Sequence, residues 1–221
     1  MTRRSPIPGS SEEQMRISRS GVPLAILCAA CDAWAGGGVF GIDHRVSQEE
    51  SGLWSRHNQI FLEYGVIVTE LGGALWYGRD SEIGRAFWQS IDASVIAGVG
   101  AQGLKYAFGR ERPAQTADPN QWFKGRHAGS FPSGEVTLQA AFVTPLISRY
   151  HNEQPWIWAL EVLPAYDAIA RVKSQAHWQS DVLAGWALGS AVGYWTGLRT
   201  DSPFSVQILP NAVTVGWRTK F

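Results

Sequence analysis

Apolar stretches spaced along residues 58–199 are the strongest indication of the fold of this 221-residue chain. In residues 58–78 the apolar side chains recur at helical spacing, and the later stretches are also long enough for helices. The stretches cover residues 58–78, 82–110, 136–150, 155–172 and 177–199. Residues 82–110 predict one or two helices, because Gly98 and Gly100 interrupt them. The pattern predicts an all-α helical bundle, and the chain is long enough for one domain with a full core.

These stretches carry groups that weaken them as membrane spans. A span needs roughly 20 apolar residues, yet the first stretch contains Glu63 and Glu70, and the fourth contains Glu161 and Asp167. Residues 182–198 are uncharged but rich in glycine. We expect buried helices of a soluble or peripheral protein, and contact with a membrane surface stays open.

The overall charge balance excludes one class of partner. The chain has 19 basic and 19 acidic residues, so its formal net charge is zero. No overall field draws the protein to nucleic acid, and we expect no nucleic-acid partner. Affinity for phosphate would therefore have to come from a local cluster of cations.

The first 35 residues predict a disordered tail followed by a signal peptide. A basic segment at residues 15–19 precedes an apolar run at residues 22–30, and Ala33, Trp34 and Ala35 form a small-x-small cleavage site. We expect export, to the periplasm, and a functional domain at residues 36–221. Cleavage after Ala35 would remove both cysteines, so we expect no disulfide in the mature chain.

In the C-terminal segment, residues 204–221, the apolar residues recur at every second position instead of at helical spacing. Val213, Val215 and Trp217 alternate with polar residues or glycine, which is typical of a strand. Together with residues 205–209 and a Pro210-Asn211 turn they predict a β-hairpin. Its role stays open between covering the bundle, forming a homo-oligomer and touching a membrane.

Three fragments carry residues suited to binding phosphate, and the first contains Lys105 and Arg112. These residues are seven apart, nearly two helical turns, so we expect both on one helix face, with Pro113 ending the helix. Arginine offers a planar fork of donors and lysine a point charge, and together they can hold one anion.

The second fragment, residues 130–135, precedes the apolar stretch from Val136. Ser133 is a favourable N-cap, and Gly134 allows a ligand to approach the backbone. The free N–H groups of a helix N-terminus bind phosphate well. Glu135 is then expected at the edge of that site.

The third fragment contains Arg171, His177 and Asp181. His177 and Asp181 are four apart, so their side chains can meet on a helix. A carboxylate on one imidazole nitrogen fixes the tautomer and leaves the other nitrogen free, which makes His177 a candidate nucleophile. Because Arg171 lies six residues before His177, we expect a helix break at residues 173–175.

Taken together, the fragments resemble the type 2 phosphatidic acid phosphatase (PAP2) superfamily, which includes bacterial acid phosphatases, lipid phosphate phosphatases and vanadium haloperoxidases. The family pattern is KxxxxxxRP, PSGH and SRxxxxxHxxxD. The chain matches it at Lys105, Arg112, Pro113, Pro132, Ser133, Gly134, Arg171, His177 and Asp181. It departs from the pattern at Ala170, where the family has serine, and at Glu135, where the family has histidine.

The resemblance implies a helical bundle and a phosphatase that forms a phosphohistidine at His177, oriented by Asp181. It implies that no metal or cofactor takes part and that phosphate is held by Lys105, Arg112, Arg171, Ser133 and Gly134. Glu135 would replace the histidine that protonates the leaving group, although three nearby cations would lower its pKa. His127, in the loop upstream, is an alternative acid.

The expected substrate is a phosphomonoester or a lipid phosphate or pyrophosphate, with residues 113–130 and Trp122 forming part of the mouth of the site. The partner is thus a phosphate-containing small molecule or lipid head group. One alternative is a non-catalytic phosphate- or phospholipid-binding protein of the same fold. Another is a vanadium haloperoxidase, which would need the imidazole that Glu135 replaces.

Overall fold

The computed structural model describes residues 37–199, 204–209 and 212–217. The tail and signal peptide expected at residues 1–35 lie outside them. The α-helices are α2 (Arg56–Tyr77), α3 (Glu82–Phe108), α4 (Gly134–Tyr150), α5 (Val162–Lys173) and α6 (Gln179–Gly197). The 3₁₀ helices are η1 (Val39–Gly41), η2 (Gly52–Trp54) and η3 (Pro155–Glu161), and the strands are β1 (Phe204–Leu209) and β2 (Ala212–Trp217). The predicted all-α bundle with a C-terminal hairpin is confirmed.

The hairpin is a two-stranded antiparallel sheet. Its register pairs Phe204 with Trp217 at the open end and Leu209 with Ala212 beside the turn. The predicted change to a two-residue period in this segment therefore corresponds to strands.

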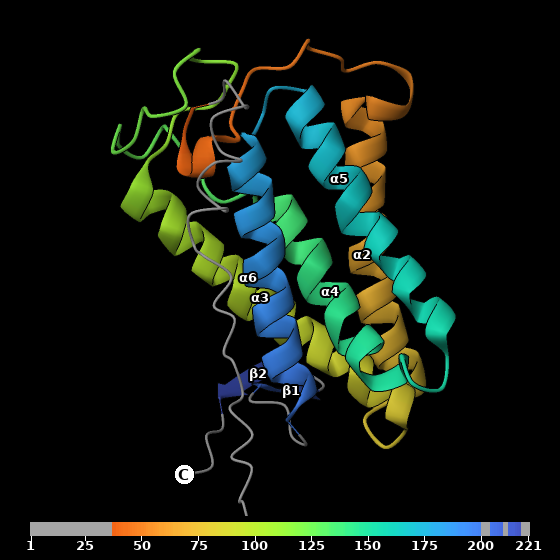
Figure 1. Cartoon of the computed structure of the whole chain (residues 1–221). Helices are drawn as coiled ribbons and strands as arrows, with labels where there is room; N and C mark the ends of the chain where they lie inside the picture. The colour runs from red at the N-terminus through yellow and green to blue at the C-terminus, as the bar shows by residue number, and fades with distance from the viewer. Residues whose placement is uncertain (1–36, 200–203, 210–211, 218–221) are drawn as a thin grey trace, which may run out of the picture. The chain divides into compact units, whose positions relative to one another are not determined.

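Helix α4 lies at the centre of the bundle. It packs against α2, α3, α5 and α6, as Figure 1 shows. The main core cluster lies where α2, α3 and α4 meet and is formed by Val66, Ala86, Phe142, Val143, Leu146 and Ile147. Burial of these apolar side chains supplies the driving force for packing.

Glycines on α6 allow this helix to approach α4 very closely. A Cβ atom at Gly189 would lie 2.3 Å from the Thr137 carbonyl oxygen, and one at Gly185 would lie 2.5 Å from that of Ser133. A larger side chain cannot occupy either position without displacing backbone. The close approach brings the segment before α6 next to the N-terminus of α4, where the second and third fragments meet.

Helix α3 ends earlier than its sequence predicts. It is one continuous helix through Gly98 and Gly100, and it stops at Phe108 because Gly109 adopts the left-handed conformation at φ 45°. The expectation that Arg112 shares a helix face with Lys105 is therefore wrong. Arg112 lies in the loop after the helix, and Pro113 does not end the helix.

The break expected between Arg171 and His177 is present. Helix α5 ends at Lys173, Gln175 has a φ of 55°, and α6 begins at Gln179. The His177 N–H donates to the Arg171 carbonyl at 3.2 Å, so the turn folds the chain back on itself. Farther upstream, the stretch starting at Pro155 begins as the 3₁₀ helix η3 rather than as an α-helix.

Within the described part of the chain, no helix combines the length and apolar character needed to cross a membrane.

Candidate functional site

Hydrogen bonds between backbone segments join the three predicted fragments into one site. The Ser130 N–H donates to the Arg110 carbonyl at 2.9 Å, and the Ser133 N–H donates to the Asp181 carbonyl at 3.0 Å. The indole Nε1 of Trp178 donates to the Glu111 carbonyl at 2.8 Å. Segments far apart in the sequence are thus fixed side by side at the N-termini of α4 and α6.

His177 is buried, and its ring is held by the backbone rather than by Asp181. Its Nδ1 lies 2.6 Å from the Ser130 carbonyl oxygen, which can only accept a hydrogen bond. The nearest oxygen of Asp181 is 3.9 Å from Nδ1. The two side chains therefore meet at ion-pair distance, as the four-residue spacing predicts, but no direct hydrogen bond joins them. The Ser130 carbonyl places the proton on Nδ1 and leaves Nε2 unprotonated.

Asp181 instead organises the groups around His177. Its Oδ2 accepts hydrogen bonds from the Ser130 hydroxyl at 2.5 Å and from the Trp178 N–H at 2.9 Å. Its Oδ1 accepts from Arg110 Nη1 at 2.6 Å. Asp181 thus fixes the orientation of Ser130, whose carbonyl in turn orients His177.

Arg110 forms the buried support of the site. Its side chain is fully buried between Asp181 and Asp43, with Nη2 2.7 Å from Asp43 Oδ2. Asp43 also accepts from the Ser180 N–H at 2.8 Å, so it stabilises the N-terminus of α6. The two carboxylates and the guanidinium form a hydrogen-bonded network in which each charge has a partner.

Lys105 lies beside the second fragment. Its Nζ donates to the carbonyls of Gly129 at 2.9 Å and Pro132 at 2.6 Å, and a Cβ atom at Gly134 would lie 3.7 Å from its Cε. Burial, together with the charge of Arg112, lowers the pKa of Lys105 to about 8. Lys105 is therefore cationic at neutral pH, beside the N-terminus of α4.

Arg171 and Arg112 complete the cation cluster. Arg171 is buried and donates from Nη1 to Gln59 Oε1 at 3.1 Å, and its Nε makes no hydrogen bond to any described residue. Burial lowers the pKa of Arg171, and so does the nearby charge of Arg112. The structure therefore brings Lys105, Arg112 and Arg171 together even though α3 ends before Arg112.

Ser133 is at the N-cap position of α4, but its side chain does not cap the helix. Its hydroxyl is fully buried and has no hydrogen-bond partner within the described chain. The first amides of α4, beginning at Gly134, have no partner within the helix. A hydroxyl and free amides beside Lys105 suit a bound oxyanion.

Glu135 is held by two arginines. Its Oε2 lies 2.7 Å from Arg56 Nη1 and its Oε1 lies 3.6 Å from Arg171 Nη1. Gln59 Oε1 accepts from both arginines. Burial raises the pKa of Glu135, but the hydrogen bond from Arg56 and the charge of Arg171 outweigh it and hold the pKa below its usual value. Glu135 is therefore ionised at neutral pH.

Two further side chains that the sequence connects with the site, His127 and Trp122, lie in the loop between α3 and α4. His127 is exposed. Trp122 packs edge-to-face on Phe108 and Phe131, and the Arg110 guanidinium lies 4.3 Å from the centre of its ring. Trp122 therefore covers the buried Arg110 network.

The sequence did not assign Asp43, Arg56, Gln59 or Arg110 to the site, although Arg110 lies within the first fragment. On a helix that continued to Arg112, Arg110 would lie on a different side from Lys105 and Arg112, so helical spacing gave it no role. Asp43 and Arg56 belong to a segment expected to be an irregular lead-in. No local pattern marks Asp43, because its partners lie 67 and 137 residues away.

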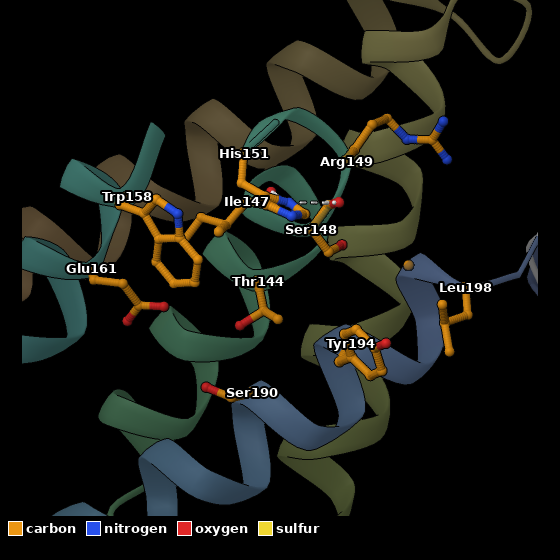
Figure 2. Close-up of a pocket in the computed structure, with 11 residues that line it drawn as sticks. Thr144, Ile147, Ser148, Arg149, His151, Trp158, Glu161, Ser190, Tyr194 and Leu198 are labelled. Atoms are coloured by element: carbon orange, nitrogen blue, oxygen red, sulfur yellow. Dashed lines mark hydrogen bonds between the residues drawn. The ribbon is translucent and has the colours of Figure 1, made fainter. Parts of the chain in front are cut away.

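One cavity of the described chain lies away from this cluster. It measures about 750 Å³ and opens between η3 and the C-terminal halves of α4 and α6. Trp158, Ile147 and Tyr194 are among its lining residues, which Figure 2 shows. His177 lies before the opposite end of α6, roughly 20 Å away at 1.5 Å of rise per residue. We assign the chemistry to the cation cluster because that is where the charged and nucleophilic groups meet.

Comparison with protein families gives a match to the model of the PAP2 superfamily over residues 88–200. The matched range begins within α3, ends after α6 and includes all three fragments. Chain elements outside it include α2, which supplies Arg56 and Gln59.

Two curated proteins are similar to this chain. The lipid A 1-phosphatase of Porphyromonas gingivalis is 32% identical over 122 residues, which cover 53% of this chain and 25% of that protein. The undecaprenyl-diphosphatase of Sulfolobus acidocaldarius is 29% identical over 102 residues, 45% of this chain and 48% of that protein. The chain therefore spans half or less of the length of these relatives. No solved structure gives a significant match.

Proposed function

Because the chain belongs to the PAP2 superfamily, we propose that it is a phosphatase that hydrolyses phosphomonoesters or lipid phosphates and pyrophosphates through a phosphohistidine at His177. The observation that carries the proposal is the meeting of three cations with one buried imidazole. Lys105, Arg112 and Arg171 gather where the α4 N-terminus faces the segment of His177. This arrangement suits the negative charge of a phosphoryl group in transfer, which positioned cations stabilise.

His177 is prepared for nucleophilic attack. Burial, together with the charges of Arg171 and Lys105, lowers its pKa to about 4, against an opposing effect of Asp181. The ring is therefore neutral at pH 7, and the Ser130 carbonyl holds the Nδ1 proton. Nε2 then carries the lone pair that attacks phosphorus.

The cation cluster supports the transferred phosphoryl group in this proposal. Arg112 and Arg171 hold its oxygens with guanidinium donors, and Lys105 adds a point charge from the other side. The Ser133 hydroxyl and the Gly134 N–H add neutral donors at the α4 N-terminus. These groups neutralise the charge without a role for a metal ion.

We also propose that the substrate carries an apolar tail and that the protein contacts a membrane surface. The relatives are named as phosphatases of lipid A and of undecaprenyl diphosphate, both lipid-linked substrates. Helix α2 begins at Arg56, beside the site, and exposes an apolar stripe at heptad-like spacing. The stripe consists of Phe61, Tyr64, Val68, Leu71 and Leu75.

Export to the periplasm is the third part of the proposal, and it rests on the residue pattern before Ala35. N-terminal sequencing of the protein recovered from a bacterial periplasm tests it. A mature chain that begins at Gly36 is expected, and recovery of an unprocessed chain from the cytoplasm alone would contradict export.

Phosphate release from three classes of substrate tests the activity. An aryl phosphate, a phosphatidic acid and a polyprenyl diphosphate are each incubated with wild type and with His177→Ala. The substitution removes the nucleophile, so turnover should fall by about 10⁴–10⁶-fold. A protein that binds phosphate or vanadate but hydrolyses none of these substrates would be a binding member of the fold, and the proposal would be wrong.

A further inference from the structure

The proposed reaction needs a proton that Glu135 does not hold at rest. Glu135 stands at the α4 N-terminus, where the family places its proton donor, but two arginines keep it ionised. An ionised carboxylate can accept a proton from a neighbour but has none of its own to donate. A leaving group with a high pKa must be protonated as it departs, so a second group has to supply that proton.

Asp167 is near enough to Glu135 for their charges to influence each other, and it is chemically unusual. It is on α5, one turn before Arg171, and is completely buried. Neither carboxyl oxygen makes a hydrogen bond to any described residue. A buried carboxylate anion without a hydrogen-bond donor is costly, and the neutral carboxyl group costs much less.

Charged groups face Asp167 from each neighbouring helix that encloses it. They are Glu135 on α4, Arg171 on α5, and Arg56 and Glu63 on α2. Burial, followed by the charge of Glu135, raises the pKa of Asp167 to about 7, although the two arginines oppose the shift. The pKa values of the two carboxyl groups are thus shifted in opposite directions, so that Glu135 is ionised and Asp167 holds the proton.

We propose that Asp167 stores the proton that reaches the leaving group and that it acts through Glu135. The inference rests on the proposed phosphatase function and deepens it. Asp167 does not touch the substrate in this proposal. It acts indirectly, by supplying the proton that Glu135 delivers. The cluster of Asp167, Glu135, Arg56 and Arg171 thus contains two carboxyl groups, and at rest the proton is on Asp167.

The proton balance closes over one turnover. As the His177 Nε2–P bond forms, the P–O bond to the leaving group breaks and its electron pair goes to the leaving oxygen. Glu135 receives a proton from Asp167 through an intervening water molecule, because no hydrogen bond joins the two carboxyl groups directly, and passes it to that oxygen. Water then attacks phosphorus, the N–P bond breaks, and a proton of the water returns through Glu135 to Asp167.

Dependence on the leaving group separates this role from a structural one. An alkyl phosphate needs leaving-group protonation, but 2,4-dinitrophenyl phosphate, whose phenolate is stable, does not. Asp167→Asn should lower kcat for the alkyl phosphate by about 10²–10³-fold, and change kcat for the dinitrophenyl ester by less than about threefold. Glu135→Gln should produce the same selective loss and serves as a second variant. Asp80→Asn, at an exposed carboxylate in the α2–α3 turn, is the matched control.

The outcomes distinguish this inference from the function on which it rests. Equal losses on both substrates, or no loss on either, with an active wild type would overturn the role of Asp167 and leave the phosphatase intact. A wild type inactive on both substrates would overturn the phosphatase and with it this role.

Unfolding as a function of pH tests the stored proton without an activity assay. The pKa of Asp167 is raised on folding, so its contribution to stability is present at low pH and is lost as pH rises toward about 7. Asparagine cannot ionise. The Tm of Asp167→Asn minus that of wild type should therefore increase between about pH 4 and pH 7. A difference that stays constant over this range, as expected for Asp80→Asn, would overturn the inference.

Discussion

Arg110 shows how one buried residue supports the site without touching the substrate. It bridges Asp43 and Asp181, so it joins the segment before α2 to the N-terminus of α6. The network fixes Ser130, whose carbonyl orients His177.

Replacing Arg110 should therefore destabilise the fold. Arg110→Met would leave two buried carboxylates without a cation, and the free energy of unfolding should fall by about 3–5 kcal/mol. Urea denaturation measures the change. Arg126→Ala, at an exposed arginine in the same loop, is the control and should stay within about 0.5 kcal/mol of wild type. A similar stability for both variants would contradict the role of Arg110.

Lys105 should give the reaction an upper pH limit. Its pKa is lowered by burial to about 8, so the cation is present below that pH and lost above it. We expect kcat/KM to fall as pH rises from about 7 to 9, because this ratio reports the ionisation of the free enzyme. In Lys105→Ala the value should be about 10²–10³-fold lower, and the limb near pH 8 should disappear. If kcat/KM of the variant still decreased near pH 8, the decrease would have to come from the ionisation of another group.

At this scale the sequence pointed to the groups that we propose act on phosphate, and it missed the residues that hold them in place. Lys105, Arg171 and His177 lie in a local pattern, and local patterns can be recognised. Asp43 meets Arg110 only through the tertiary fold, and spacing therefore gave no hint of it. The role predicted for Asp181 also changed, since a helix boundary two residues after His177 altered which atom contacts the ring.

Close packing of α4 against α6 sets the distance between the second and third fragments. It depends on glycine at positions where the two backbones meet. A Cβ atom at Gly189 would lie 2.3 Å from the Thr137 carbonyl oxygen and 2.8 Å from Ala140 Cβ. The geometry of the site therefore depends on the packing of α4 against α6, although this interface carries none of the proposed catalytic groups.

Enlarging Gly189 should separate the helices. Gly189→Ala is expected to lower the free energy of unfolding by about 1–3 kcal/mol because backbone must shift. Gly72→Ala on α2 is the matched control, since its new methyl group would have no atom within 4 Å. That control should gain about 1 kcal/mol from the better helix propensity of alanine. Equal behaviour of the two variants in thermal unfolding would contradict the packing argument.

The positions of the α-helices were predictable from apolar periodicity, and their ends were less so. The end of α3 depends on Gly109, whose left-handed conformation stops the helix four residues before Pro113. The segment at Pro155 forms 3₁₀ turns before α5. The break near Gln175 was predicted because the chemistry required Arg171 and His177 to meet.

The molecule as a whole combines a polar site with an apolar helix face. Helix α2 turns Glu70 into the bundle and exposes Phe61 and Val68, at 75% and 69% of their surface. Its N-terminus lies at the site through the ion pair of Arg56 with Glu135. A lipid surface against this face would present head groups near the cations.

Polar substitutions on this face should affect lipid substrates selectively. The double variant Phe61→Ser, Val68→Ser is expected to lower kcat/KM for a lipid phosphate in vesicles by about tenfold, through lost apolar burial. Its activity on a water-soluble aryl phosphate should not change. Val99→Ser, at a 70% exposed valine of α3, is the control. Equal losses on both substrates would contradict membrane contact, and a change in oligomer size would assign the face to a second copy of the chain.

The central claim is that His177 carries the phosphoryl group, and trapping of the phosphoenzyme tests it most directly. Wild type, His177→Ala and Asp80→Asn are mixed with a ³²P-labelled phosphomonoester and denatured in alkali, in which phosphohistidine survives. We predict label on wild type and on Asp80→Asn and none on His177→Ala. Label of equal amount on His177→Ala, or turnover by wild type without any labelled protein, would contradict the account.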